Sequence, residues 1–263
     1  MAHLLYSLVV LAYAFVPQLV SAACECGYQT HSIKSNENKV FTDVLESDFL
    51  HLKDINAQQD WKRQVWDIPA VGTAPWGRNM TLENVILNPL PGDVGTEGVN
   101  GRDPGLELRV SAGEPRRGAV KSGEVATARR DMFYGSFRAG IKYTGQHGTC
   151  GAFFFYQSDR GEIDVEFLSK LYQDPAKAAD LLLVIHAGPE VSTNELFRPT
   201  PLSFRPQDGY HEYRFDWTPE RITYYADGQF LWETSVGVPK QAGGLTLNHW
   251  SNGDPGWSSG LPA

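Results

Sequence analysis

The stretch Glu162-Ile-Asp-Val-Glu-Phe167 is the part of the sequence that decides the fold class. Three carboxylates alternate there with three apolar residues. Alternate side chains of a β-strand point to the same face. Glu162, Asp164 and Glu166 are therefore predicted to form one acidic row, while the residues between them enter a core.

An acidic row of this kind has two interpretations. Like charges along one face repel each other and destabilise the strand, so the row is either a solvated face or a site that needs the charges. Paired carboxylates whose pKa values differ are the groups that cleave glycosidic bonds. Aromatic β-rich runs on both sides of the row favour a site, namely Gly151-Ala-Phe-Phe-Phe-Tyr156 and Leu245-Thr-Leu-Asn-His-Trp250.

The remaining sequence is typical of an all-β domain. Short β-like runs recur between turns rich in the 26 glycines and 16 prolines, which predicts a β-sandwich or jelly roll. One helical turn is expected within 174–179. No linker or repeat divides residues 23–263. The predicted strands are 40–44, 49–52, 62–68, 82–87, 106–111, 124–129, 133–143, 150–156, 162–168, 181–186, 212–217, 222–226, 230–233 and 245–250.

Length and charge narrow the class of partner. The 263 residues can bury a sizeable core. A net charge of −8 and a pI near 5.4 argue against nucleic acid and against an anionic membrane surface, which both attract basic patches. A neutral polysaccharide is compatible with this charge, and we expect a monomer.

The N-terminus predicts export. Residues 4–20 are apolar, and Val20-Ser-Ala22 supplies small residues before a cleavage site. We expect a signal peptide over residues 1–22 and a secreted chain. The alternative is a membrane anchor, but the run is short for a membrane span and contains Pro17.

Three cysteines, Cys24, Cys26 and Cys150, are an odd number for a secreted protein. A bridge from Cys24 or Cys26 to Cys150 would tie the N-terminus to the sheet. The Cys-x-Cys pair lacks the further spaced ligands of a metal site. The sequon Asn79-Met-Thr81 predicts a glycosylated asparagine in a loop.

At Glu162–Phe167 the chain resembles glycoside hydrolase family 16, the family of endo-β-glucanases and glucan transglycosylases. The resemblance runs from Ser122 to Trp250 and rests on segments in the family's order. They are Ser122-Gly-Glu-Val125, Phe133-Tyr-Gly-Ser-Phe-Arg-Ala-Gly-Ile-Lys142, Ala152-Phe-Phe-Phe-Tyr156, Gly161–Phe167, 210–217, 222–228 and Leu247-Asn-His-Trp250.

This resemblance implies a jelly roll of two packed antiparallel sheets with a concave substrate cleft. It also implies a nucleophile at Glu162, an assisting carboxyl at Asp164 and the acid/base at Glu166. These roles need Glu162 ionised and Glu166 protonated at rest. Strict alternation, without the extra residue of a β-bulge, is similar to the lichenase and transglycosylase branches.

Further substrate-binding residues follow from the same resemblance. Asn248 and Trp250 match an Asn-x-Trp that grips glucose on the glycone side, and Trp250 could alternatively be a core residue. Tyr156 and Phe154 match cleft aromatics, although one face of this run must fill the core. Glu124 matches a substrate-binding glutamate only by local alignment.

The strand over residues 181–186 and the end of the chain depart from the family's pattern. Residues 181–186 lack the family's Asn-x-Tyr on the acceptor side, and His186 is either a surface residue or a ligand. The family continues into a further strand, so we expect a truncated domain.

The sequence leaves a leading interpretation of the function and two alternatives. The leading interpretation is a secreted retaining endo-β-glucanase, which acts outside the cell or in the cell wall without a cofactor. A structural calcium ion is left open. The alternatives are a wall transglycosylase and a non-catalytic carbohydrate-binding jelly roll.

Overall fold

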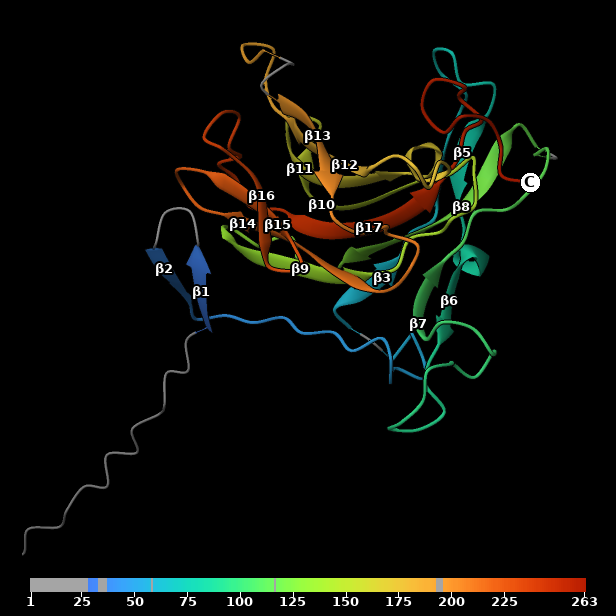
Figure 1. Cartoon of the computed structure of the whole chain (residues 1–263), viewed down its shortest axis with the longest axis horizontal. Coiled ribbons are helices and arrows are strands. Elements are labelled where there is room, and N and C mark those ends of the chain that lie inside the picture. Colours follow the sequence, from blue (N-terminus) through green and yellow to red (C-terminus); the bar gives the residue numbers. More distant parts are fainter. Residues whose placement is uncertain (1–27, 33–36, 58, 116, 193–195) are drawn as a thin grey trace, which may run out of the picture.

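The computed structural model describes residues 28–32, 37–57, 59–115, 117–192 and 196–263. The predicted signal peptide, Cys24 and Cys26 lie outside these residues. The described chain is nearly all β, as the sequence predicts (Figure 1). No helix among the described residues is long and apolar enough to cross a membrane.

Two sheets carry the architecture. The large sheet has nine strands in the order β13-β12-β11-β10-β17-β8-β5-β4, with β3 also paired to β8, and the small sheet has the order β16-β15-β14-β9. Two hairpins, β1-β2 and β6-β7, lie outside these sheets. The large sheet comprises β3 (Trp61–Arg63), β4 (Trp66–Ile68), β5 (Gly77–Met80), β8 (Ala119–Thr127), β10 (Cys150–Ser158), β11 (Gly161–Leu168), β12 (Ala179–His186), β13 (Phe197–Leu202) and β17 (Gly244–Trp250).

The small sheet comprises β9 (Gly135–Ile141), β14 (His211–Trp217), β15 (Ile222–Ala226) and β16 (Gln229–Thr234). The hairpins are β1 (Tyr28–Ser32) with β2 (Glu37–Phe41), and β6 (Val85–Asn88) with β7 (Gly105–Leu108). Figure 1 shows the large sheet bowed, with its concave face turned away from the small sheet.

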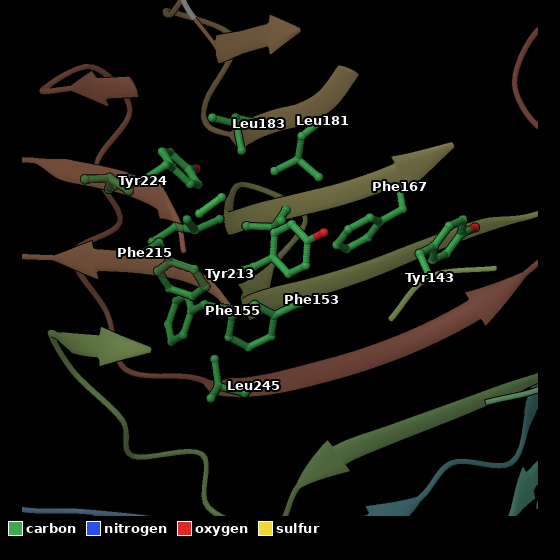
Figure 2. Close-up of a cluster of buried hydrophobic side chains, with 14 of the residues drawn as sticks. Tyr143, Phe153, Phe155, Phe167, Leu181, Leu183, Tyr213, Phe215, Tyr224 and Leu245 are labelled. Atoms are coloured by element: carbon green, nitrogen blue, oxygen red, sulfur yellow. The ribbon is translucent and has the colours of Figure 1, made fainter. Parts of the chain in front are cut away.

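The core fills the space between the two sheets (Figure 2). Strands β10, β11 and β14 each send alternate side chains into it, as their period-two patterns require. Trp217 of the small sheet is fully buried, and its ring centroid lies 4.5 Å from that of Phe155 in the large sheet. The buried residues from these three strands are Phe153, Phe155, Ile163, Val165, Phe167, Tyr213, Phe215 and Trp217.

Several local predictions are wrong. Residues 49–52 form a turn, because Asp48 Oδ1 accepts the Leu50 N–H at 2.9 Å and holds the chain in a bend. The helical turn lies earlier than predicted, as a 3₁₀ helix over Ser169–Tyr172. Asp174 instead caps a simple turn, in which its Oδ1 accepts the Ala176 N–H at 2.9 Å. Residues 82–84 are 3₁₀ rather than strand.

Strand β13 is absent from the predicted set because its sequence contains Pro199 and Pro201. It forms an edge of the large sheet and pairs only with β12. Alternate backbone N–H groups of a strand point to the same side, so both prolines can face away from β12. Proline is tolerated at such an edge.

Candidate active site

The acidic row lies on the outer, concave face of the large sheet. Ile163, Val165 and Phe167 enter the core, so the three carboxylates of β11 point the other way. Each of them has one neighbour on β10 and one on β12 in register. The triplets are Tyr156–Glu162–His186, Phe154–Asp164–Val184 and Ala152–Glu166–Leu182.

Asp164 is the most enclosed of the three acids, with 2% of its surface exposed. Burial, followed by the charges of Glu162 and Glu166, raises the pKa of Asp164 well above its ordinary value. Asp164 also shares a hydrogen bond with Glu162. These two effects favour an Asp164 that keeps its proton and donates it to the Glu162 carboxylate.

Glu162 feels opposing influences. Burial is the largest influence and raises the pKa of Glu162 above its ordinary value, while the hydrogen bond from Asp164 and the positive charge that His186 can carry oppose that shift. The hydrogen bond stabilises the ionised form of Glu162. Among the three acids, Glu162 is therefore the one that its surroundings equip to be an anion.

At Glu166 nothing comparable in the described part of the chain opposes the effect of burial. Burial first, and then the charge of Glu162, raise its pKa to about 7. Its neighbours in register are the small Ala152 and the apolar Leu182, and they offer its carboxyl group no side-chain hydrogen bond. A protonated Glu166 can thus give its proton to a bound molecule.

His186 stands at the edge of this group. Its Nε2 lies 3.4 Å from Asp164 Oδ2, an oxygen that is buried without a hydrogen-bond partner. In the part of the chain that the structure describes, Glu162, Asp164 and His186 form the one group spaced to share a metal ion, with ligand atoms within 4.8 Å. The structural calcium ion left open above stays an untested expectation.

A second polar group lies two strands away, on β8 and β17. Glu124 and Asn248 are register partners there. Glu124 Oε1 accepts the Trp66 Nε1–H at 2.9 Å, and its Oε2 accepts the Asn248 Nδ2–H at 3.4 Å. Burial raises the pKa of Glu124. Asn248 Oδ1 is buried without a partner, so this group holds an unused acceptor.

Trp250 lies in the same part of the face. The Arg78 guanidinium carbon is 4.5 Å from the centre of its ring and 5.7 Å from that of Trp66. Trp250 also packs, partly buried, against a small apolar cluster that contains Cys150 and Leu182 and is separate from the main core. Trp250 thus packs partly into a small core cluster, and its role as a substrate-binding residue stays a prediction.

The aromatic run on β10 divides as its alternation predicts. Phe153 and Phe155 are buried in the core, while Phe154 and Tyr156 face outward beside the acidic row. The Tyr156 hydroxyl donates to Asp159 Oδ1 at 2.9 Å. Its ring is therefore fixed at the end of the row that holds Glu162.

Sequence reasoning missed Trp66 and Arg78. The stretch before Ser122 has no motif that resembles the family's substrate-binding segments, and its strands reach the site only through long-range pairing. Strand β5 pairs in parallel with β8, and β4 pairs with β5. The local sequence carries no signal of such parallel pairing.

Comparisons with known proteins identify the family of the chain. A sequence profile described as glycosyl hydrolases family 16 matches residues 94–260, which is more than half of the chain. The chain belongs to glycosyl hydrolase family 16. The matched range includes the acidic row, the aromatic run on β10, Glu124, Asn248 and Trp250.

Individual relatives within family 16 are distant. A beta-glucanase of Bacillus amyloliquefaciens is 29% identical over 150 residues, which are 55% of this chain and 59% of the relative. One from Acetivibrio thermocellus is 32% identical over 136 residues, 49% and 37% of the two chains. The chain thus spans 59% of the length of the first relative and 37% of the length of the second.

A solved structure has a similar fold. The structure described as a prokaryotic beta-1,3-1,4-glucanase (lichenase) from a mouse hindgut metagenome superposes with a TM-score of 0.58. The two chains are 21% identical, with 81% of this chain and 89% of that chain covered. This likeness concerns the fold.

Proposed function

We propose that this chain is a secreted, retaining endo-β-glucanase that cleaves β-1,3 and β-1,4 linkages of glucans by double displacement. The observation that carries the proposal is the contrast between two glutamates on one strand. Burial raises the pKa of both, but at Glu162 a hydrogen bond from Asp164 opposes the shift, whereas no such bond among the described residues opposes it at Glu166, whose pKa is raised to about 7. One anion and one acid are what a retaining glycosidase requires.

In the first step, a Glu162 carboxylate oxygen attacks the anomeric carbon of the bound sugar and forms an ester. The glycosidic C–O bond breaks as the Glu166 proton passes to the leaving oxygen. Asp164 keeps its proton and holds the attacking carboxylate in place through their hydrogen bond.

In the second step, water hydrolyses the ester. The ester has removed the Glu162 charge, which is one of the two causes of the raised Glu166 pKa. The pKa of Glu166 therefore falls at this stage, and its carboxylate can take the proton from water. The water oxygen attacks the anomeric carbon, Glu162 leaves, and two inversions restore the β configuration.

The binding groups support a neutral glucan as the substrate. Asn248, Trp250 and Glu124 form the glycone side, and Phe154 and Tyr156 place aromatic surface next to the acidic row. Sugar rings pack against such surface through their C–H faces, and we expect contacts comparable to the about 0.5–1.5 kcal/mol of an aromatic pair. The predicted signal peptide, the monomeric state and the absence of a required cofactor belong to the same proposal.

One observation favours transglycosylation as a second candidate. On the acceptor side, β12 and β13 present Leu182, Val184 and Phe197, and Phe197 is 40% exposed beside Val184 in register. An exposed aromatic ring there could bind a sugar acceptor, which then competes with water for the glycosyl-enzyme.

The test is to incubate the enzyme with barley β-glucan, lichenan, laminarin and chitin-linked glucan and to follow the first products by ¹H NMR. We expect β-anomers that mutarotate later. First products in the α configuration would contradict double displacement. Products longer than the substrate would favour the transglycosylase, and no turnover of any glucan would contradict both enzymes.

A further inference from the structure

Arg78 is a cation on the proposed glycone side, and no carboxylate among the described residues forms an ion pair with it. Its guanidinium group lies between two indole rings, 4.5 Å from the centre of Trp250 and 5.7 Å from that of Trp66. Arginine engages aromatic faces in this way more often than lysine does. The arrangement joins β5, β4 and β17, so it fixes the guanidinium relative to the rest of the site.

The donors of Arg78 are unused. Among the described residues, Arg78 makes no ion pair within 4 Å, and its recorded contacts are the two rings. Burial lowers its pKa, while the more distant charges of Glu124 and Glu162 oppose that shift. A guanidinium carries five N–H donors, and a partly buried donor without a partner is unfavourable unless a ligand or water satisfies it.

An unused acceptor lies close by. Asn248 Oδ1 is buried without a hydrogen-bond partner, while its Nδ2 is engaged by Glu124. Asn248 and Trp250 are two residues apart on β17 and share a face, at a spacing of about 7 Å along the strand. Arg78 stacks on the second of these residues. The glycone side thus offers cationic donors and a neutral acceptor next to each other.

We propose that Arg78 is a substrate-binding residue that donates hydrogen bonds to hydroxyl groups of a glycone-side sugar. This inference rests on the proposed glucanase function and names a residue of the same site. A hydroxyl group both donates and accepts, so a sugar with neighbouring hydroxyls can satisfy Arg78 and Asn248 Oδ1 together. An anionic group only accepts, and the carboxylates of Glu124 and Glu162 would repel it.

The experiment measures binding without turnover. Glu162→Gln is used as the parent, and its affinity for a mixed-linkage β-glucan tetrasaccharide is measured by calorimetry. Arg78→Met and Arg78→Lys are made in this parent. Arg138→Met is the control, because Arg138 lies on the small sheet, away from the site, with an ion-pair distance of 3.8 Å to Glu212.

We expect Arg78→Met to weaken binding by roughly tenfold or more, as the loss of a charge-assisted hydrogen bond does. Arg78→Lys should restore only part of the affinity, and Arg138→Met should bind like the parent. In the active enzyme, Arg78→Met should raise KM more than it lowers kcat if the contact is equally strong in ground and transition states.

Tetrasaccharides that each lack one hydroxyl group distinguish a direct contact of Arg78 with the substrate from a purely structural role. Removal of the hydroxyl that Arg78 contacts should weaken binding to the parent but not to Arg78→Met. Equal losses in both proteins for every deoxy sugar would overturn the inference, as would unchanged affinity of Arg78→Met. A parent that binds no β-glucan would contradict the proposed function itself and this inference with it.

Discussion

Glu166 shows how much of the chemistry resides in single residues. It is an ordinary glutamate, yet burial and the charge of Glu162 raise its pKa to about 7. Asp164, two residues away, is even more enclosed and pairs with Glu162. The sequence predicts the acidic face and the need for one raised pKa. It cannot predict which neighbours fill the space around each acid.

The pKa of Glu166 predicts the alkaline side of the pH profile. Deprotonation removes the general acid, so kcat/KM should fall as the pH rises through about 7. Glu162→Gln removes a negative charge that raises this pKa, and should therefore lower the pKa of Glu166. Carbon NMR of the glutamate side chains measures both values. Glu212→Gln, on the small sheet, serves as the control.

A profile of kcat/KM that stays flat well above pH 7, or a Glu166 that titrates at the same pH in Glu162→Gln, would contradict this description of the electrostatics.

The sequence does not predict which residues of other strands join the site. Arg78 and Trp66 join the site only because β4 and β5 pair next to β8.

Among the elements, β11 combines a stabilising face with a destabilising one. Its apolar residues are buried in the core, and its acids crowd one another on the other face. Period-two alternation made β10, β11 and β17 predictable from the sequence. Edge strand β13 was not predictable, because Pro199 and Pro201 are read as turn signals unless the open edge is known.

Glu166 on β11 should make the free energy of unfolding of the protein smaller at high pH than at low pH. A carboxyl group whose pKa is higher in the folded state than its ordinary 4.5 contributes stability below 4.5. This contribution is lost as the pH rises towards about 7. The full loss is at most about 3–4 kcal/mol, at about 1.4 kcal/mol per pKa unit.

Glu166→Gln abolishes this titration, so its melting temperature relative to the wild type should be higher at pH 8 than at pH 4.5. Scanning calorimetry at the two values checks it. An equal difference at both values would mean that Glu166 titrates normally in the folded protein.

On the scale of the whole molecule, the contact between the two sheets holds the site in shape. Trp217 has no exposed surface and lies against Phe137 of the small sheet and Phe155 of the large one. The sandwich was predictable from many short strands and turns. The pairing order of the sheets was not, because it depends on contacts between residues far apart in the sequence.

Trp217→Ala should remove about 3–5 kcal/mol of stability by leaving a cavity between the sheets. That is a large part of the 5–15 kcal/mol typical of a domain. Urea unfolding followed by circular dichroism measures the loss. Phe133→Ala is the control, since Phe133 contacts the same ring but is 47% exposed. A similar small loss in both variants would show that the Trp217 contact does not bind the sheets together.

The central claim is that Glu162 forms a covalent bond with the sugar, and trapping that bond tests it most directly. The enzyme is treated with a β-glucan oligosaccharide glycoside that carries fluorine at C2 and an activated leaving group, and is then digested for peptide mass spectrometry. We predict one glycosyl group per chain, attached to Glu162. An active enzyme that forms no adduct, or an adduct on another residue, would contradict the account.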